Sequence, residues 1–407
     1  MTGRTAPDGF LWGTAISAHQ SEGGNTNSDS WLLEHMTPSA YAEPAHDACD
    51  AYHHYGEDIA LAASLGFNCY RFGIEWARIE PEPGFFSNAA LGHYRRMLET
   101  CHAHGLQPMV SYNHFTVPRW YAARGGFEAA DGAEIFARFA GRVTAALGDL
   151  IPYAATFNEA NIALLVRIMR RGRGAETIAA MLAAAAKASG SDIFSSVLFS
   201  DPDRINAGLY AAHKAAMQAI RAERSSITLG LLLTMQQVEG VGENNLAAAV
   251  QQALYGNWLA EADNCDFLGV QTYTRFRVGD KGALPIPEDA ERTASGYEYR
   301  PQALGATIRL AAASTSRPIY VTESGIATDD DTRRVAFIDA ALDEVRACLD
   351  EGIDVRSFIQ WSMLDNFEWT AGYGQRFGMV DVDRATFKRM PKPSAYHLGA
   401  HARANRI

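Results

Sequence analysis

The sequence has few of the features that mark metal-binding or disulfide-stabilised proteins. Its five cysteines are odd in number and scattered, without a CxxC pair or a metal-ligand spacing with histidine. Thiols in such a pattern are typical of core-filling side chains in a reducing compartment. They are Cys49, Cys69, Cys101, Cys265 and Cys348.

Long apolar runs and an excess of positive charge are also missing. No uninterrupted apolar run reaches the roughly 18 residues needed to cross a bilayer, and residues 1–13 show no secretory leader pattern. The formal net charge of −11 disfavours nucleic acid and anionic membranes as partners, because both would be repelled at long range. We therefore expect a cytoplasmic enzyme acting on a small neutral molecule, with an oligomeric state that the sequence leaves open.

The 407 residues alternate short β-branched or aromatic runs with longer segments of helical period. Several strand candidates are apolar throughout, as buried parallel strands are. Eight such units predict an α/β fold, a single (β/α)8 TIM barrel, with one catalytic domain over residues 1–407 and an extended βα loop at about 160–203. The strand candidates are FLWGTAIS, NCYRFGIEW, QPMVSYNHF, YAATFNEAN, ITLGLLLTM, DFLGVQTYT, PIYVTESG and SFIQWSML. Helices are expected at 56–65, 91–104, 133–147, 205–224 and 332–351.

Two carboxylates stand at predicted strand ends. Glu159 closes the fourth candidate strand and Glu323 the seventh. The C-terminal strand ends of such a barrel form its active-site face, and glycoside hydrolysis needs a pair of carboxyl groups there. Spacing alone leaves the alternative that each is a solvated surface group, since the chain has 47 acidic residues.

Polar and aromatic side chains fall at other strand ends. Amides, histidine and carboxylate suit sugar hydroxyls, and indole faces pack on the apolar side of a sugar ring. Taken singly, each side chain also has a structural explanation, such as a core histidine, a core tryptophan or a structural ion pair of arginine. At or just past strand ends stand Gln20, His114, Asn158, Tyr273, Trp361, Glu368 and Trp369, and Arg71 within the second strand joins this set.

Several longer strings resemble glycoside hydrolase family 1, the β-glucosidase family, in the expected order from about Phe10 to Tyr396. The resemblance implies that Glu159 is the general acid/base and Glu323 the nucleophile, with Arg71 and Tyr273 hydrogen-bonded to the nucleophile. These neighbours should favour the charged form of Glu323, whose charge should in turn raise the pKa of Glu159. The strings are FLWGTAISAHQSEG, YRFGIEWARIEPEPG, YNHFTVPRW, TFNEAN, YVTESG and WSMLDNFEWTAGYGQRFGMVDVD.

The same resemblance implies a second set of side chains that bind the sugar. These are Asn158 at the 2-hydroxyl, Gln20, His114 and Trp369 near the 3-hydroxyl, Glu368 with Gln20 at the 4- and 6-hydroxyls, Trp361 beneath the ring and Phe377 near its far edge.

Four departures from the family pattern stand out, and none removes a charged catalytic group. The usual proline after the acid/base is Ala160, and the usual asparagine after the nucleophile is Ser324. Residues 271–272 read Gln-Thr before the retained tyrosine, and residues 115–116 read Phe-Thr after His114.

The predicted fourth loop carries a cluster of arginines in an otherwise acidic chain: Arg167, Arg170, Arg171 and Arg173. A charge cluster is usually a solvated face. The alternative is that the loop overhangs the aglycone entrance and favours an anionic or extended aromatic leaving group.

The predicted reaction is retaining hydrolysis of a terminal β-linked sugar in a small glycoside, without metal or organic cofactor. Glu368 would repel a phosphate, so we expect unphosphorylated sugars: glucose first, then galactose or fucose. A transglycosidase on the same fold is an alternative. A catalytically silent sugar-binding protein is a second, disfavoured because both glutamates are retained.

Overall fold

The eight predicted strands form one closed parallel barrel in the computed structural model, which describes residues 4–170, 172 and 174–407. Their order round the barrel is β1-β11-β10-β7-β5-β4-β3-β2, and β1 closes it by pairing with β11 and β2. The predicted (β/α)8 fold class is confirmed. The strands are β1 (Leu11–Ala15), β2 (Cys69–Gly73), β3 (Gln107–Ser111), β4 (Tyr153–Ala155), β5 (Thr228–Thr234), β7 (Phe267–Thr272), β10 (Ile319–Ser324) and β11 (Val355–Trp361).

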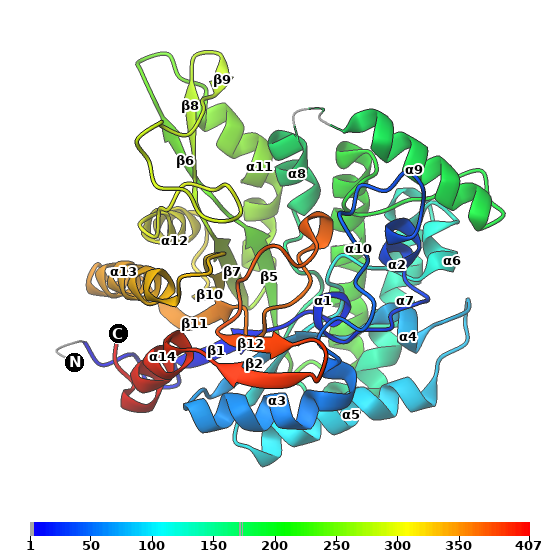
Figure 1. The fold of residues 1–407 in the computed structure, drawn as a ribbon, viewed down its shortest axis with the longest axis horizontal. Coiled ribbons are helices and arrows are strands. Elements are labelled where there is room, and N and C mark those ends of the chain that lie inside the picture. The colour runs from blue at the N-terminus through cyan, green and yellow to red at the C-terminus, as the bar shows by residue number, and fades with distance from the viewer. Residues whose placement is uncertain (1–3, 171, 173) are drawn as a thin grey trace.

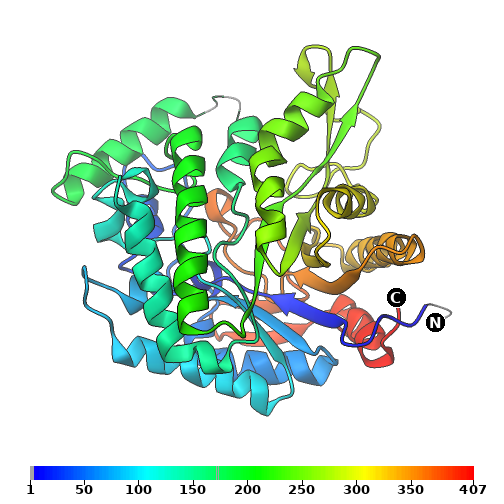
Figure 2. The same cartoon turned by 180° about the vertical axis from the view of Figure 1, so that it is seen from behind.

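Long helices surround the barrel, and their ends follow from local sequence (Figures 1 and 2). Ser87 caps α5 by accepting from the Ala90 amide, and Asp201 with Pro202 begins α10. Gly66 ends α3 with a φ of 105°, which a side chain would disfavour. The five predicted helices occur with ends shifted by a few residues. The long helices are α3 (Ala51–Leu65), α5 (Asn88–Ala103), α7 (Gly132–Leu147), α10 (Pro202–Glu223), α11 (Ala247–Glu261), α12 (Ala303–Ser314), α13 (Asp331–Asp350) and α14 (Pro393–Ala404).

The barrel interior is filled by side chains rather than open. Met109, Leu232, Phe267 and Ile359 belong to one buried cluster inside it. Gly230 must be glycine, because a Cβ there would lie 2.2 Å from the Phe267 ring. The interior is therefore a packed core, which leaves the C-terminal strand ends as the place for a site. All five cysteines are buried and free.

Additional elements follow the C-terminal ends of the barrel strands. The predicted extended loop at 160–203 contains two helices, α8 (Ile162–Arg170) and α9 (Ala175–Ala188). A small sheet of β6 (Gln237–Gly240), β8 (Arg275–Gly279) and β9 (Gly282–Ala283) projects above β5 and β7 in Figure 1. The other short elements are α1 (Ala18–Ser21), α2 (Asp29–Glu34), α4 (Trp76–Ile79), α6 (Arg119–Ala122), the hairpin β12 (Val380–Asp383) and β13 (Lys388–Pro391), and four 3-10 turns at Gly126–Glu128, Gly148–Leu150, Ala262–Asn264 and Trp369–Ala371.

The described N-terminal residues and the C-terminus lie side by side, at one edge of the barrel (Figures 1 and 2). Thr5 and Arg406 form an antiparallel bridge, and the Ile407 amide donates to the Arg4 carbonyl at 3.0 Å. None of the helices that the structure describes combines the length and the apolarity that crossing a bilayer requires.

Candidate active site

A cavity of about 330 Å³ opens at the C-terminal ends of the barrel strands. Its walls come from segments far apart in the chain, because each follows a different strand. All the residues predicted for catalysis and sugar binding line it, except Arg71, which lies behind Glu323. The lining members of that set are Gln20, His114, Asn158, Glu159, Tyr273, Glu323, Trp361, Glu368, Trp369 and Phe377.

Glu323, on β10, is held by two donors, Arg71 on β2 and Tyr273 directly after β7. Arg71 Nη1 donates to Oε1 at 2.6 Å, and the Tyr273 hydroxyl donates to Oε2 at 2.5 Å. Burial raises the pKa of Glu323 above its ordinary value, and Arg71 and Tyr273 oppose that rise without cancelling it. Arg71 and Tyr273 lower the pKa of Glu323, as expected from the sequence, but burial raises it by more. Burial and the Glu323 charge raise the pKa of Tyr273 well above its usual range, so its phenol stays a donor.

Glu159 occupies a strained backbone position at the end of the fourth strand unit. Its φ is 43°, in the left-handed region that a non-glycine residue adopts only where its surroundings hold it. The following amide, Ala160 N–H, donates to the Leu232 carbonyl at 2.9 Å and fixes the turn. Burial, followed by the charge of Glu323, raises the pKa of Glu159 to about 8, against a hydrogen bond from Thr234. The carboxyl is therefore protonated at neutral pH.

Asn158 connects the nucleophile side of the cavity to His114. Its Oδ1 accepts from Arg71 and, at 2.8 Å, from Gln271 Nε2. Its Nδ2 lies 3.1 Å from His114 Nε2, and an amide nitrogen can only donate, so Nε2 accepts. Burial and Arg71 hold the pKa of His114 well below its usual range. The neutral ring then carries its hydrogen on Nδ1.

Glu368 supplies a carboxyl oxygen without a partner. Its Oε1 is buried and makes no hydrogen bond within the described part of the chain. Hydrogen bonds from Trp361 and Gln20 reach this carboxyl group, while burial raises its pKa well above the usual range. Gln20 is fully buried and its Nε2 donates to the Phe367 carbonyl at 2.8 Å. A polar ligand that reaches Glu368 would satisfy a group that is costly to leave unpaired.

Aromatic rings form one wall of the cavity. Trp369 is stacked on His19, with ring centroids 5.6 Å apart, and Trp361 is stacked on His114 at the same separation. Behind Trp369, His19 Nε2 lies 2.6 Å from Glu34 Oε1, and both side chains are fully buried. Burial lowers the pKa of His19, but Glu34 and neighbouring carboxylates outweigh it and raise the pKa overall. A buried ion pair thus supports the indole wall.

Several lining residues were not predicted from the sequence. Thr234 ends β5 and Gln236 follows it, so the strand-end rule that found Glu159 applies to them as well. Gln236 Oε1 accepts from the Tyr273 and Thr274 amides at 3.1 and 2.9 Å and so fixes the backbone that carries Tyr273. Tyr297 lies in a long irregular segment before α12, where no periodicity marks it.

A second cavity of about 470 Å³ adjoins the first between α8, α9 and the segment before α10. The two cavities share three lining residues, Val166, Arg170 and Leu198. The remaining lining residues are mostly apolar: Ala163, Ala175, Ile178, Ala179, Leu182, Val197, Phe199 and Pro202, with Glu128, Arg167, Gly172, Ser200 and Asp201. We call this second cavity the side chamber.

The arginine cluster is only partly solvated. Arg167 Nη1 lies 2.5 Å from Asp203 Oδ1, and both side chains are exposed. The Arg170 guanidinium lies over the Phe199 ring at 4.5 Å and donates to the Leu198 carbonyl at 2.7 Å. Arg170 thus belongs to the wall between the two cavities. Arg171 and Arg173 lie outside the described residues.

Comparisons with known proteins agree with this geometry. The family model described as glycosyl hydrolase family 1 matches residues 2–174 and 209–407. A thermostable beta-glucosidase B of Thermobispora bispora is 30% identical, over 96% of this chain and 89% of that protein. A bifunctional beta-D-glucosidase/beta-D-fucosidase of Bifidobacterium breve is 26% identical, over 95% of this chain and 96% of that protein. The solved apo structure of a beta-glucosidase 1317 superposes with a TM-score of 0.94 at 48% identity, over 98% of this chain and 99% of that one.

Proposed function

The chain belongs to glycosyl hydrolase family 1, and from that membership we propose that it is a retaining β-glycosidase that removes a terminal β-linked sugar through a covalent glycosyl-enzyme. The observation that carries the proposal is the unequal environment of the two carboxyls in one cavity. Arg71 and Tyr273 contact Glu323, whereas burial and the charge of Glu323 keep the proton on Glu159. Two carboxyls with different protonation states are what acid/base and nucleophile roles require.

In the first step, the Glu323 carboxylate attacks the anomeric carbon while Glu159 gives its proton to the glycosidic oxygen. The bond to the aglycone breaks, and the alcohol leaves with that proton. Arg71 and Tyr273 orient the attacking carboxylate.

In the second step, Glu159 acts as a base. Esterification of Glu323 removes the negative charge that contributes to the raised pKa of Glu159. The deprotonated carboxylate then takes a proton from water as the water attacks the anomeric carbon. The bond from that carbon to Glu323 breaks, and Glu323 leaves as a free carboxylate. The second inversion at that carbon restores the original configuration.

The sugar pocket favours a neutral hexose. Glu368 Oε1 has no partner among the described residues and can accept from a 4- or 6-hydroxyl in either epimer at carbon 4. A phosphate would be repelled by the Glu323 carboxylate, and the Glu368 carboxyl offers it no positive charge. We therefore propose glucose as the preferred sugar, with galactose or fucose accepted. The bifunctional name of the Bifidobacterium breve relative fits this range.

The side chamber favours an apolar aglycone over an anionic one. Arg167 is neutralised by Asp203, and the Arg170 guanidinium is stacked on Phe199, so neither presents a bare charge to a leaving group. The apolar lining gains free energy when it is covered by an alkyl or aryl group. Because Val166, Arg170 and Leu198 line both cavities, an aglycone bound beyond Glu159 can extend into the chamber.

The test is proton NMR of the first-formed sugar from a panel of aryl β-glycosides. We expect the β-anomer to appear first and the α-anomer to follow by mutarotation. An α-anomer as first product would contradict the retaining mechanism. Repeating the reaction with an alcohol acceptor measures how much glycosyl-enzyme goes to transglycosylation, the alternative on the same intermediate.

A further inference from the structure

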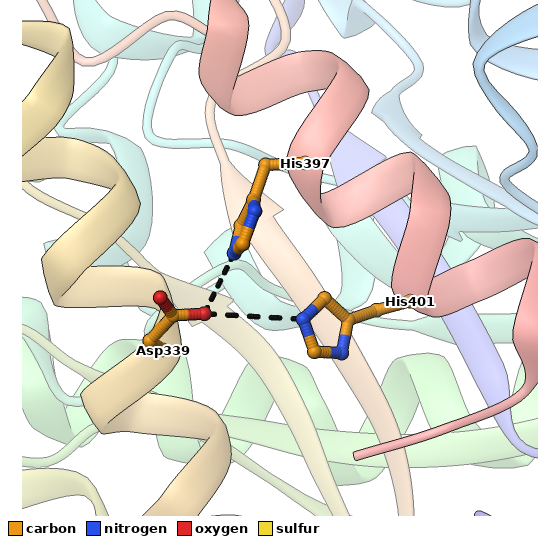
Figure 3. A group of neighbouring side chains, drawn as sticks. All are labelled: Asp339, His397 and His401. Carbon is orange, nitrogen blue, oxygen red and sulfur yellow. Dashed lines mark hydrogen bonds and ion pairs between the residues drawn. The ribbon is translucent and has the colours of Figure 1, made fainter. Parts of the chain in front are cut away.

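A cluster of three metal-type ligands joins the last helix to the barrel, away from the active-site cavity. Asp339 on α13 faces His397 and His401, which are four residues apart on α14 (Figure 3). Residues at i and i+4 share one face of a helix, so both rings reach the same point. Among the described residues, these three side chains form the group that could hold a metal ion. One ligand atom from each lies within 4.8 Å of the others.

The distances suit a small cation. Asp339 Oδ1 lies 2.6 Å from His397 Nε2 and 3.8 Å from His401 Nε2. Ligand atoms bound tetrahedrally to zinc lie about 3.3 Å apart, given bonds of about 2.0–2.1 Å. The two observed distances fall on either side of that separation. Small side-chain rotations would equalise them, and the Asp339 and His397 side chains, 51% and 32% exposed, both border solvent.

The hydrogen bond behind His401 prepares its ring as a ligand. His401 Nδ1 lies 2.9 Å from the Arg406 carbonyl oxygen, which can only accept, so Nδ1 carries the hydrogen. In the neutral ring, Nε2 then has a lone pair, and it faces the carboxylate oxygen of Asp339. Two electron-rich atoms facing each other are stabilised by a cation between them. A backbone carbonyl bound to the other ring nitrogen is the usual support of a metal-binding histidine.

We propose that Asp339, His397 and His401 bind a divalent transition-metal ion, Zn²⁺ by ligand type, as a structural clamp of α14 on α13. Two imidazole nitrogens and one carboxylate select zinc over calcium or magnesium, which prefer oxygen ligands. The clamp holds the C-terminal segment in place. The same segment is also bound to β1, because the Trp12 indole N–H donates to Asn405 Oδ1 at 3.0 Å. The site has no part in glycoside cleavage.

The experiment is zinc titration by calorimetry on metal-stripped protein without a polyhistidine tag, with visible absorption of the Co²⁺ form as a second readout. We expect one equivalent to bind at micromolar affinity and to raise the melting temperature by roughly 2–4 °C at saturating zinc. His397→Ala and His401→Ala should each weaken binding at least tenfold. His104→Ala, which removes an exposed histidine elsewhere, is the matched control and should bind as the parent does.

Failure to bind zinc at micromolar concentration would overturn the proposal. Binding that stays unchanged in both His397→Ala and His401→Ala would also overturn it, because the ion would then sit elsewhere. All variants should retain turnover of an aryl β-glucoside, and this separates the clamp from the catalytic proposal.

Discussion

At the scale of single residues, the roles proposed for Glu159 and Glu323 rest on the groups that contact each carboxyl. Glu323 accepts hydrogen bonds from the Arg71 guanidinium and the Tyr273 phenol. Glu159 is buried and has a hydrogen bond with Thr234. Asn158 connects Arg71, which contacts Glu323, to His114, because its side chain accepts from Arg71 and donates to His114. Because the charge of Glu323 contributes to the raised pKa of Glu159, the protonation of Glu159 depends on the charge state of Glu323.

Glu159→Ala should separate substrates by leaving group. Hydrolysis of an alkyl β-glucoside, whose alcohol needs a proton to leave, should fall by roughly 10²–10⁴-fold. Glycosylation by a dinitrophenyl glucoside should be much less affected, because that phenolate leaves unprotonated. Stopped-flow measurement of dinitrophenolate release makes the comparison. Equal loss on both substrates would assign proton donation to another residue.

Tyr273→Phe should change the pH profile on its acidic side. The phenol lowers the pKa of Glu323, so its loss moves the acidic limb of kcat/KM to higher pH, since Glu323 must be ionised to attack. The alkaline limb of the profile reports loss of the Glu159 proton, whose pKa is about 8. Loss of a hydrogen bond to a charged group should also lower kcat/KM roughly 10–100-fold.

The matched control is Tyr297→Phe, which removes a hydroxyl from the same cavity. Among the described residues, the side chains that hydrogen-bond to Glu323 are Arg71 and Tyr273, not Tyr297. It should leave the acidic limb in place. A shift of the same size in both variants would mean that cavity polarity, rather than the Tyr273 bond, governs Glu323.

Sequence reasoning reached the polar and aromatic lining residues that stand at strand ends or within the motifs that resemble the family, and it missed most of the apolar lining. Glu159, Glu323 and Trp361 follow apolar runs that mark their strands. Tyr297 was out of reach, because its segment has no period and its place depends on tertiary packing. The net rise in the pKa of Glu323 was also out of reach, because burial cannot be weighed against contacts before the fold is known.

At the scale of elements, α8 and α9 line the side chamber that adjoins the active-site cavity. The extended segment at 160–203 was predicted from its broken rhythm, but the side chamber beneath it was not, because helix packing decides which apolar side chains are left uncovered. The strands and their parallel order were predictable, since all-apolar runs bounded by helices have few other arrangements. The β6-β8-β9 sheet was not predicted, because its strands are short and half-exposed.

Ala179→Trp should test the chamber. Ala179 lines it, and an indole there would occupy the space proposed for an aglycone chain. KM for octyl β-glucoside should rise roughly tenfold, as expected when two or more methylenes lose their apolar surroundings. KM for nitrophenyl β-glucoside should change little. Ala180→Trp, on the neighbouring exposed position outside the chamber lining, is the control. The same effect from both variants, or none from either, would remove the chamber from substrate binding.

At the scale of the whole molecule, the barrel and its last elements are tied by buried charges. Arg389 on β13 pairs with Asp58 on α3 through two hydrogen bonds of 2.7 and 2.9 Å, and both side chains are almost fully buried. This pair connects segments 331 residues apart. Removing one partner would leave a buried charge without its counterion, which is costly.

Asp58→Ala should lower the free energy of unfolding by roughly 3–5 kcal/mol, measured by urea denaturation or, if refolding fails, by the melting temperature. Asp343→Ala, which breaks an exposed pair with Arg346, should cost less than about 1 kcal/mol. The folded fraction of Asp58→Ala should keep its KM for aryl glucosides. Equal stability of the two variants would show that burial of the Asp58–Arg389 pair does not determine how much the pair contributes to the free energy of unfolding.

The central claim is that Glu323 forms a covalent bond to the sugar. The most direct measurement is mass spectrometry of peptides after reaction with dinitrophenyl 2-deoxy-2-fluoro-β-glucoside, whose fluorine slows breakdown of the glycosyl-enzyme. The account predicts one deoxyfluoroglucosyl group per chain, on the peptide that contains Glu323 and at that side chain. A label on Glu159 or any other residue, or turnover with inversion and no label at all, would contradict it.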